Sequence, residues 1–172
     1  MSTTTAPPTR PVNVAGIPAE LAARPQWVCW RWEWVDGRWT KIPMNPKTGG
    51  RASSTAPTTW APVKTAIAFM ERHNLPGIGF VVTPHDPFVG IDLDDCRSPE
   101  TGDIAAWARQ IVDDFDSLTE ITPSETGLRI WITTHDGLLP EGVHGRRKGP
   151  VEIYGAGRFF TVTGHRLERT GS

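Results

Sequence analysis

The amino-acid sequence predicts a soluble α+β domain in which an antiparallel or mixed sheet carries its helices on one face. Three observations lead to this prediction. The 172 residues suffice for one domain with its own hydrophobic core. The 38% of hydrophobic residues, 16 prolines and 17 glycines are typical of a loop-rich globular protein. Short runs that alternate apolar and polar residues are interspersed with two segments of helical period, which predicts strands and helices in mixed order.

A β-hairpin is the first predicted element. Residues 27–35 (WVCWRWEWV) and 38–44 (RWTKIPM) alternate large apolar with polar residues, and the Asp36-Gly37 pair between them suits a type I′ turn. This alternation assigns most of the five tryptophans of the hairpin to packing, although such rings are also known to stack on nucleic-acid bases. Residues 45–58 are rich in Pro, Gly, Ser and Thr, and they predict a long loop.

The middle of the chain predicts a helix followed by two strands. Thr58 or Thr59 is expected to cap a helix that runs to about His73. Residues 77–82 and 88–94 are predicted strands, and we expect the turn-forming sequence between them to pair them antiparallel.

The second half predicts one more helix and three more strands. Asp103 is expected to cap a helix whose apolar residues repeat at helical spacing as far as Phe115. Short strands are predicted from Leu128, Val151 and Arg158.

The ends of the chain and its cysteines bound the class of protein. Residues 1–16 are expected to be a disordered tail, 17–166 the domain and 167–172 a C-terminal tail, and residues 1–16 lack the apolar segment of a signal peptide. No apolar run approaches the roughly 18 residues that a membrane span needs, so we expect no membrane contact. The two cysteines have no metal-ligand spacing, which argues against a disulfide framework or zinc site and favours the cytoplasm.

Charge is distributed unevenly along the sequence. The formal net charge is −1, which argues against bulk electrostatic binding of duplex DNA. Residues 86–125 contain eleven acidic and two basic residues, so the rest of the chain carries a net charge of +8. The acidic centre is either a solvated face or a cation site beside a polyanionic substrate.

Three carboxylates are candidates for such a cation site. The period of a strand places Asp92 and Asp94 on one face, about 7 Å apart at their Cα atoms. Glu152 lies on the outward face of the short VEIY strand in the same way. If the two strands are neighbours, the three carboxylates converge, and their oxygens suit Mg²⁺ or Mn²⁺. An exposed polar sheet face remains the alternative.

A Ser/Gly turn runs into the strand that carries Arg129. Ser124 and Gly127 belong to a turn of the kind that offers a hydroxyl and backbone N–H groups to phosphate oxygens, and Arg129 adds a charged fork. An ordinary capped turn is the alternative interpretation.

In their order and spacing these segments resemble a known family. The matching stretches are KIPMNPKTGGRASS, GIGFVV, GIDLDDC, TEITPSETGLRIWI and VEIYGAGRFFTVTG. Together they resemble the primase-polymerase domain of phage and plasmid replication proteins, in the archaeo-eukaryotic primase superfamily. The resemblance covers nearly everything from Trp27 to Gly164. It implies an RRM-like catalytic sheet joined to a small N-terminal α/β unit, with a metal-dependent site for nucleotidyl transfer.

The resemblance also assigns roles to individual residues. The first motif of the family, in which two Asp alternate with hydrophobic residues, falls on Asp92 and Asp94, and the third falls on Glu152. The second, a Ser followed by a basic residue that is often His, falls on Ser124 and Arg129. This departs from the family because Arg cannot exchange a proton as His does. The resemblance further implies phosphate contacts from Lys41, Gly127, Arg158 and His165.

The sequence therefore predicts the catalytic domain of a DNA primase-polymerase. Its implied cofactors are two divalent ions, Mg²⁺ or Mn²⁺, and its implied partners are nucleoside triphosphates and a single-stranded or primed DNA template. Family members commonly continue into a helicase, so a helicase domain in the same or a partner chain is also expected. The Arg146-Arg147-Lys148 run either contacts template phosphates or is a solvated loop.

Two alternatives remain open. One is a nuclease or replication initiator on a related sheet, but the chain has no His-hydrophobic-His pair and only one tyrosine, Tyr154. The other is a nucleotide- or single-stranded nucleic-acid-binding module without catalysis. A decayed site of that kind should have lost one of the three carboxylates, and all three are present.

Overall fold

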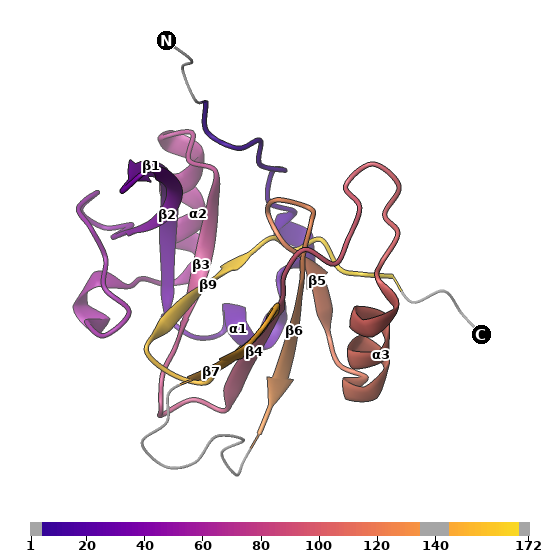
Figure 1. Ribbon diagram of the computed structural model, residues 1–172. Helices are drawn as coiled ribbons and strands as arrows, with labels where there is room; N and C mark the ends of the chain where they lie inside the picture. Colours follow the sequence, from indigo (N-terminus) through magenta and orange to yellow (C-terminus); the bar gives the residue numbers. More distant parts are fainter. Residues whose placement is uncertain (1–4, 135–144, 169–172) are drawn as a thin grey trace.

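A computed structural model describes residues 5–134 and 145–168, and it confirms the α+β class (Figure 1). In this part of the chain the strands form two antiparallel sheets, ordered β2-β1-β3-β9 and β5-β6-β4-β8-β7. The elements are η1 (Val14–Gly16), α1 (Ala19–Ala22), β1 (Trp27–Val35), β2 (Arg38–Met44), η2 (Pro57–Thr59), α2 (Val63–Arg72), β3 (Gly77–Val82), β4 (Phe88–Leu93), α3 (Ala106–Phe115), β5 (Thr119–Ile121), β6 (Leu128–Thr133), β7 (Gly145–Lys148), β8 (Val151–Tyr154) and β9 (Arg158–Val162).

The predicted hairpin is confirmed. Strands β1 and β2 pair antiparallel and Val35 faces Arg38 across the turn. Asp36 and Gly37 have φ values of 50° and 80°, as a type I′ turn requires at both of its central positions.

The expected pairing of β3 with β4 is wrong. Strand β3 lies between β1 and β9 in the first sheet, whereas β4 lies between β6 and β8 in the second. Both strands are buried along their whole length. Neither therefore shows the alternation of exposed and buried residues that would indicate its position in a sheet. The turn between them crosses from one sheet to the other. Asp86 holds it by accepting hydrogen bonds from the backbone N–H of Thr83 and Phe88.

Both expected helix caps are also wrong. Helix α2 begins after Pro62, and Thr59 belongs to the preceding η2. Helix α3 begins after Ala105 because Asp103 lies in a turn closed by the isolated bridge between Arg97 and Ile104. In each case the polar residue belongs to a turn that ends before the helix begins, so it does not cap the helix.

Strands β5 and β7 were not predicted from the sequence. Strand β5 has only three residues, and β7 has the sequence GRRK. They form the two edges of the second sheet. Short or charged edge strands carry no hydrophobic alternation, so their sequences give no strand signal.

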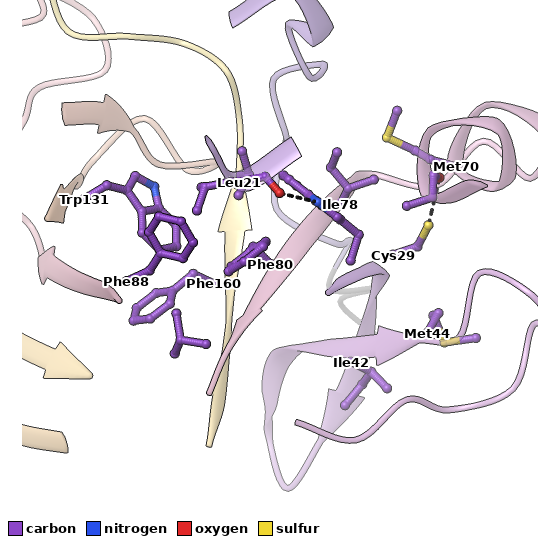
Figure 2. Packing of buried hydrophobic residues seen from close by; sticks show 14 residues of the cluster. Leu21, Cys29, Ile42, Met44, Met70, Ile78, Phe80, Phe88, Trp131 and Phe160 are labelled. Carbon is purple, nitrogen blue, oxygen red and sulfur yellow. Dashed lines mark hydrogen bonds between the residues drawn. The ribbon is translucent and has the colours of Figure 1, made fainter. Parts of the chain in front are cut away.

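One aromatic core joins the two sheets. Figure 2 shows Phe80 and Phe160 of the first sheet packed near Phe88 and Trp131 of the second. The ring centroids of Trp131 and Phe160 are 5.3 Å apart in an edge-to-face arrangement. Gly90 of β4 permits this contact because a Cβ at that position would lie 2.7 Å from the Phe160 ring. A second cluster packs α3 against the other face of the second sheet.

The N-terminal segment lies against the domain. The N–H of Asn13 donates to the carbonyl oxygen of Thr163 (2.9 Å), and Arg10 lies 3.4 Å from the carboxylate of Glu125. Residues 1–4 and 169–172 of the two expected tails lie outside the described residues, and the proposed domain limits stay a prediction. No helix in the described ranges is both long and apolar enough to cross a membrane.

Candidate active site

A cavity of about 1030 Å³ receives side chains from both sheets. Strands β2 and β9 of the first sheet contribute Lys41 and Thr161, and strands β4 and β8 of the second contribute Asp92 and Glu152. The shared aromatic core fixes the two sheets relative to each other and therefore places these groups.

A row of charged residues crosses all five strands of the second sheet on the cavity side. The row, from β5 to β7 in register, is Glu120, Arg129, Asp92, Glu152 and Arg147. Cross-strand partners point to the same face of a sheet, and the neighbouring positions Ile91 and Ile130 point into the core cluster beneath α3. The first four members of the row are at most 7% exposed, so their charges interact in a medium where unpaired charge is costly.

Arg129 is held by contacts inside the protein. Its Nε donates to Oδ1 of Asp92 at 2.6 Å. One of its terminal nitrogens donates to the hydroxyl of Thr161 at 2.9 Å and to the carbonyl oxygen of the same residue. Its guanidinium carbon lies 4.9 Å from the centroid of the Phe160 ring. These contacts occupy Nε and one terminal nitrogen, so the second terminal nitrogen is the donor that can serve a ligand.

Glu152 is paired with two exposed arginines. Oε1 lies 3.3 Å from Arg147 and also accepts a hydrogen bond from the hydroxyl of Tyr154 at 3.3 Å. Oε2 lies 3.7 Å from Arg158. The side chain of Arg147 is 64% exposed and that of Arg158 is 42% exposed, so they can leave Glu152 at small cost.

Asp94 follows β4 directly, with its backbone N–H bonded to the carbonyl oxygen of Pro150 at 2.8 Å. Burial raises the pKa of its carboxyl group above the usual value, and the negative charges of Asp92 and Glu152 raise it further. The three carboxylates are therefore close enough to repel one another.

With the side chains placed as they are in this structure, no three His, Cys, Asp or Glu residues within 5–134 and 145–168 gather around a common point that could hold a metal ion. Arginines neutralise Asp92 and Glu152 instead. The chemistry of the donor set nevertheless fits a hard divalent cation, because it consists of carboxylates whose charges disfavour one another, and the arginines paired with Glu152 are solvent-accessible.

Lys41 enters the cavity from the first sheet. Its Nζ lies 5.2 Å from the Trp32 ring and 5.7 Å from the Trp30 ring. Burial lowers its pKa to about 8, and the charge of Arg129 acts in the same direction, whereas Asp92 and Asp94 oppose the shift.

The Ser124 turn borders the cavity and is closed by its own hydrogen bonds. The N–H of Glu125 donates to the carbonyl oxygen of Thr122, and the N–H of Gly127 donates to the Thr122 hydroxyl. The hydroxyls of Ser124 and Thr126 are 2.7 Å apart. The turn therefore presents hydroxyl groups to the cavity. The backbone N–H groups of Glu125 and Gly127 are used within the turn, although a turn of this kind was expected to offer backbone N–H groups to phosphate.

The cavity brings together most of the residues singled out from the sequence. Those that line it are Lys41, Asp92, Asp94, Ser124, Gly127, Arg129, Glu152 and Arg158. His165 is not among the lining residues, and its ring nitrogen Nε2 lies 2.6 Å from the carbonyl oxygen of Pro11.

Sequence reasoning missed Glu120 and Thr161. Glu120 is almost fully buried, where its two oxygens accept hydrogen bonds from Trp131 (3.5 Å) and the Gly164 N–H (3.2 Å). Burial raises its pKa, and the charge of Arg129 opposes the shift. The sequence signal was a single acidic residue between Thr119 and Ile121 shortly before the Ser124 turn, and its meaning depends on which strand pairs with it.

Comparisons with known proteins supply one informative relative. No family model matches the chain. Over 143 residues, the chain is 40% identical to a protein named DNA primase-polymerase from Nitratiruptor phage NrS-1. The match covers 81% of this chain and 19% of that protein. The chain thus corresponds to about a fifth of the length of this relative.

Proposed function

Because this chain is related to a phage DNA primase-polymerase, we propose that it is a nucleotidyltransferase domain that extends or initiates DNA strands on a single-stranded or primed template. The observation that carries the proposal is the cavity in which Asp92, Asp94 and Glu152 lie beside cationic side chains. Carboxylates suit divalent ions, and the cations suit a triphosphate.

Asp92, Asp94 and Glu152 would hold two divalent ions, Mg²⁺ or Mn²⁺. Such ions, when bound, acidify the attacking 3′-hydroxyl and stabilise negative charge on the leaving pyrophosphate. Arg129 fixes the orientation of Asp92 through the contact at Oδ1. Rigid placement of a ligand in this way lowers the reorganisation that the reaction requires.

The cationic residues would bind and orient the triphosphate. Arg158 can turn from Glu152 to a phosphate oxygen because its side chain is exposed. Lys41 and Arg129 line the same cavity. In the reaction the 3′-oxygen forms a bond to the α-phosphorus, the bond from this phosphorus to pyrophosphate breaks, and the hydroxyl proton passes to solvent. Positioning of the two reacting groups supplies much of the acceleration.

Nucleotide incorporation on a primed template tests this function directly. The parent protein is expected to extend the primer with labelled nucleoside triphosphates when Mg²⁺ or Mn²⁺ is present, and to fail with a chelator. Asp92→Ala is expected to fail under all conditions. Asp113→Ala, an exposed acidic residue of α3, is the matched control and should keep the parent rate. Extension by Asp92→Ala, or by the parent without metal, would contradict the proposal.

A binding module without catalysis is the second candidate. It is favoured by the arginines that already neutralise Asp92 and Glu152, since the cavity could then accept a nucleotide without any metal. A parent protein that binds nucleotides equally with and without Mn²⁺, and never extends a primer, would support this candidate.

Lys41 gives nucleotide binding a pH dependence. Its pKa of about 8 means that it is charged below that pH and neutral above it. Affinity for a nonhydrolysable triphosphate, measured without metal, is expected to fall roughly tenfold from pH 7.5 to 9.5, the effect of losing one charge-assisted contact. Lys41→Arg should bind equally across this range because Arg keeps its charge. A parent affinity that is flat with pH would exclude contact between Lys41 and the triphosphate.

A further inference from the structure

One face of the hairpin formed by β1 and β2 carries a series of tryptophans. Because residues of a strand alternate between its faces, Trp30, Trp32 and Trp34 of β1 share one face. Trp34 is paired in register with Trp39 of β2, and Trp32 is paired with Lys41. Four aromatic rings and one lysine therefore follow one another along this face.

The rings become more exposed toward the tip of the hairpin. Trp30 is buried, Trp32 and Trp39 are partly buried, and Trp34 is 52% exposed. Trp34 and Trp39 pack edge to face with their centroids 5.5 Å apart. The Trp32 N–H donates to the Thr9 hydroxyl at 3.0 Å, which fixes the orientation of that ring. Packing explains Trp30 but leaves the exposure of Trp34 unexplained.

The opposite face of the hairpin has a different character. Its inner end packs Trp27 and Cys29 into the core. Farther out, Glu33 pairs with Arg31 at 2.6 Å and with Arg51 at 2.8 Å. These charged side chains are paired with one another within the protein. The aromatic face differs because its outer ring, Trp34, is exposed to solvent.

The aromatic face is continuous with the cavity. Lys41 lies beside the Trp32 ring and also lines the cavity. Farther across the same sheet, Val28 is paired with Gly79 and Gly79 with Thr161, which places Thr161 on this face as well. Thr161 holds Arg129 beside Asp92. The tip of the hairpin and the carboxylates are thus connected by one surface.

We propose that Trp34, Trp39 and Trp32, here called the tryptophan track, stack the bases of a single-stranded DNA template and lead it past Lys41 into the cavity. The proposal rests on the proposed function. Aromatic side chains bind bases without sequence preference because every base has a π face, and Lys41 supplies the positive charge that the backbone requires. A strand whose bases stack at the hairpin tip reaches the carboxylates without leaving this surface.

Binding of a fluorescently labelled oligo-dT, measured by anisotropy without metal or nucleotide, tests the track. Trp34→Ala and Trp39→Ala are each expected to weaken binding about tenfold, whereas Trp34→Phe should keep most of the affinity. Trp107→Ala removes a similarly exposed tryptophan from α3 and is the matched control, with affinity expected within twofold of the parent.

Salt dependence separates stacking from charge. Trp34→Ala should leave the slope of log affinity against log salt unchanged because stacking releases no counterions, whereas Lys41→Met should reduce it by about 0.7. Affinity of a folded Trp34→Ala within twofold of the parent would overturn the proposal, as would an equal loss in Trp107→Ala. The assay needs no catalysis. The track can therefore fail while primer extension succeeds, and it can be confirmed even when extension fails.

Discussion

Asp94→Asn is expected to lower the rate of nucleotide incorporation about a thousandfold, equivalent to about 4 kcal/mol of transition-state stabilisation, while the protein stays as stable as the parent or becomes more stable. The loss of rate follows because one carboxylate leaves the proposed ion site. The stability follows because burial, and after it the negative charges of Asp92 and Glu152, disfavour the ionised form of Asp94 and raise its pKa. Above that pKa the ionised carboxyl destabilises the fold, and asparagine removes the charge.

The adjacent Asp95 provides the control for this prediction. Asp95 also lines the cavity and has a φ of 50°, a conformation that asparagine tolerates. Asp95→Asn should keep incorporation within a few-fold of the parent. Primer extension and thermal unfolding are measured on both variants. An active Asp94→Asn protein would remove Asp94 from the ion site, and an unfolded one would show that the residue has a structural role.

Arg129→Met is expected to destabilise the fold by about 3–5 kcal/mol in urea or guanidinium unfolding. The substitution leaves the buried carboxylate of Asp92 without its partner at 2.6 Å, and a buried charge that loses its partner costs about this much. Glu120 lies on the neighbouring strand β5, and burial raises its pKa. The substitution also removes the positive charge that opposes this rise. The loss of Arg129 thus acts on two buried acids at once.

A double-mutant cycle identifies the source of this loss. Arg129→Met combined with Asp92→Asn should recover part of the stability because Asp92 then carries no unpaired charge. Arg129→Lys should fold but bind nucleotide more weakly, since an ammonium group cannot reproduce the fork that serves Asp92 and Thr161 together. A loss below about 1 kcal/mol in Arg129→Met, or strictly additive effects in the cycle, would mean that the pair does not stabilise the fold.

Local patterns explain how much of this molecule was predictable. The hairpin followed from alternation and from the Asp36-Gly37 turn. Alternation likewise placed Asp92 and Glu152 on outward-facing positions, and the structure pairs them across β4 and β8. Such patterns specify which face a residue occupies, because the period of a strand is a property of the backbone.

Neighbours in space were not predictable in the same way. The sequence placed Arg129 on the strand after the Ser124 turn and offered phosphate as its partner, whereas the structure pairs it with Asp92. The wrong pairing of β3 with β4 has the same cause. Strands buried on both faces are nearly uniformly apolar, so only the packing of the complete chain decides which strand lies beside which.

The order of strands also bears on when this domain can fold during synthesis. Strand β9 is the last strand within the described residues, yet it completes the first sheet by pairing Val162 with Ile78 of β3. Thr161, which holds Arg129, arrives with it. A nascent chain therefore carries β3 with one edge unpaired until residue 162 has left the ribosome, and exposed edges of this kind invite pairing with other chains. Such distant pairing also makes folding slow. The β3 edge thus stays open to pairing with other chains until late in the synthesis of this domain.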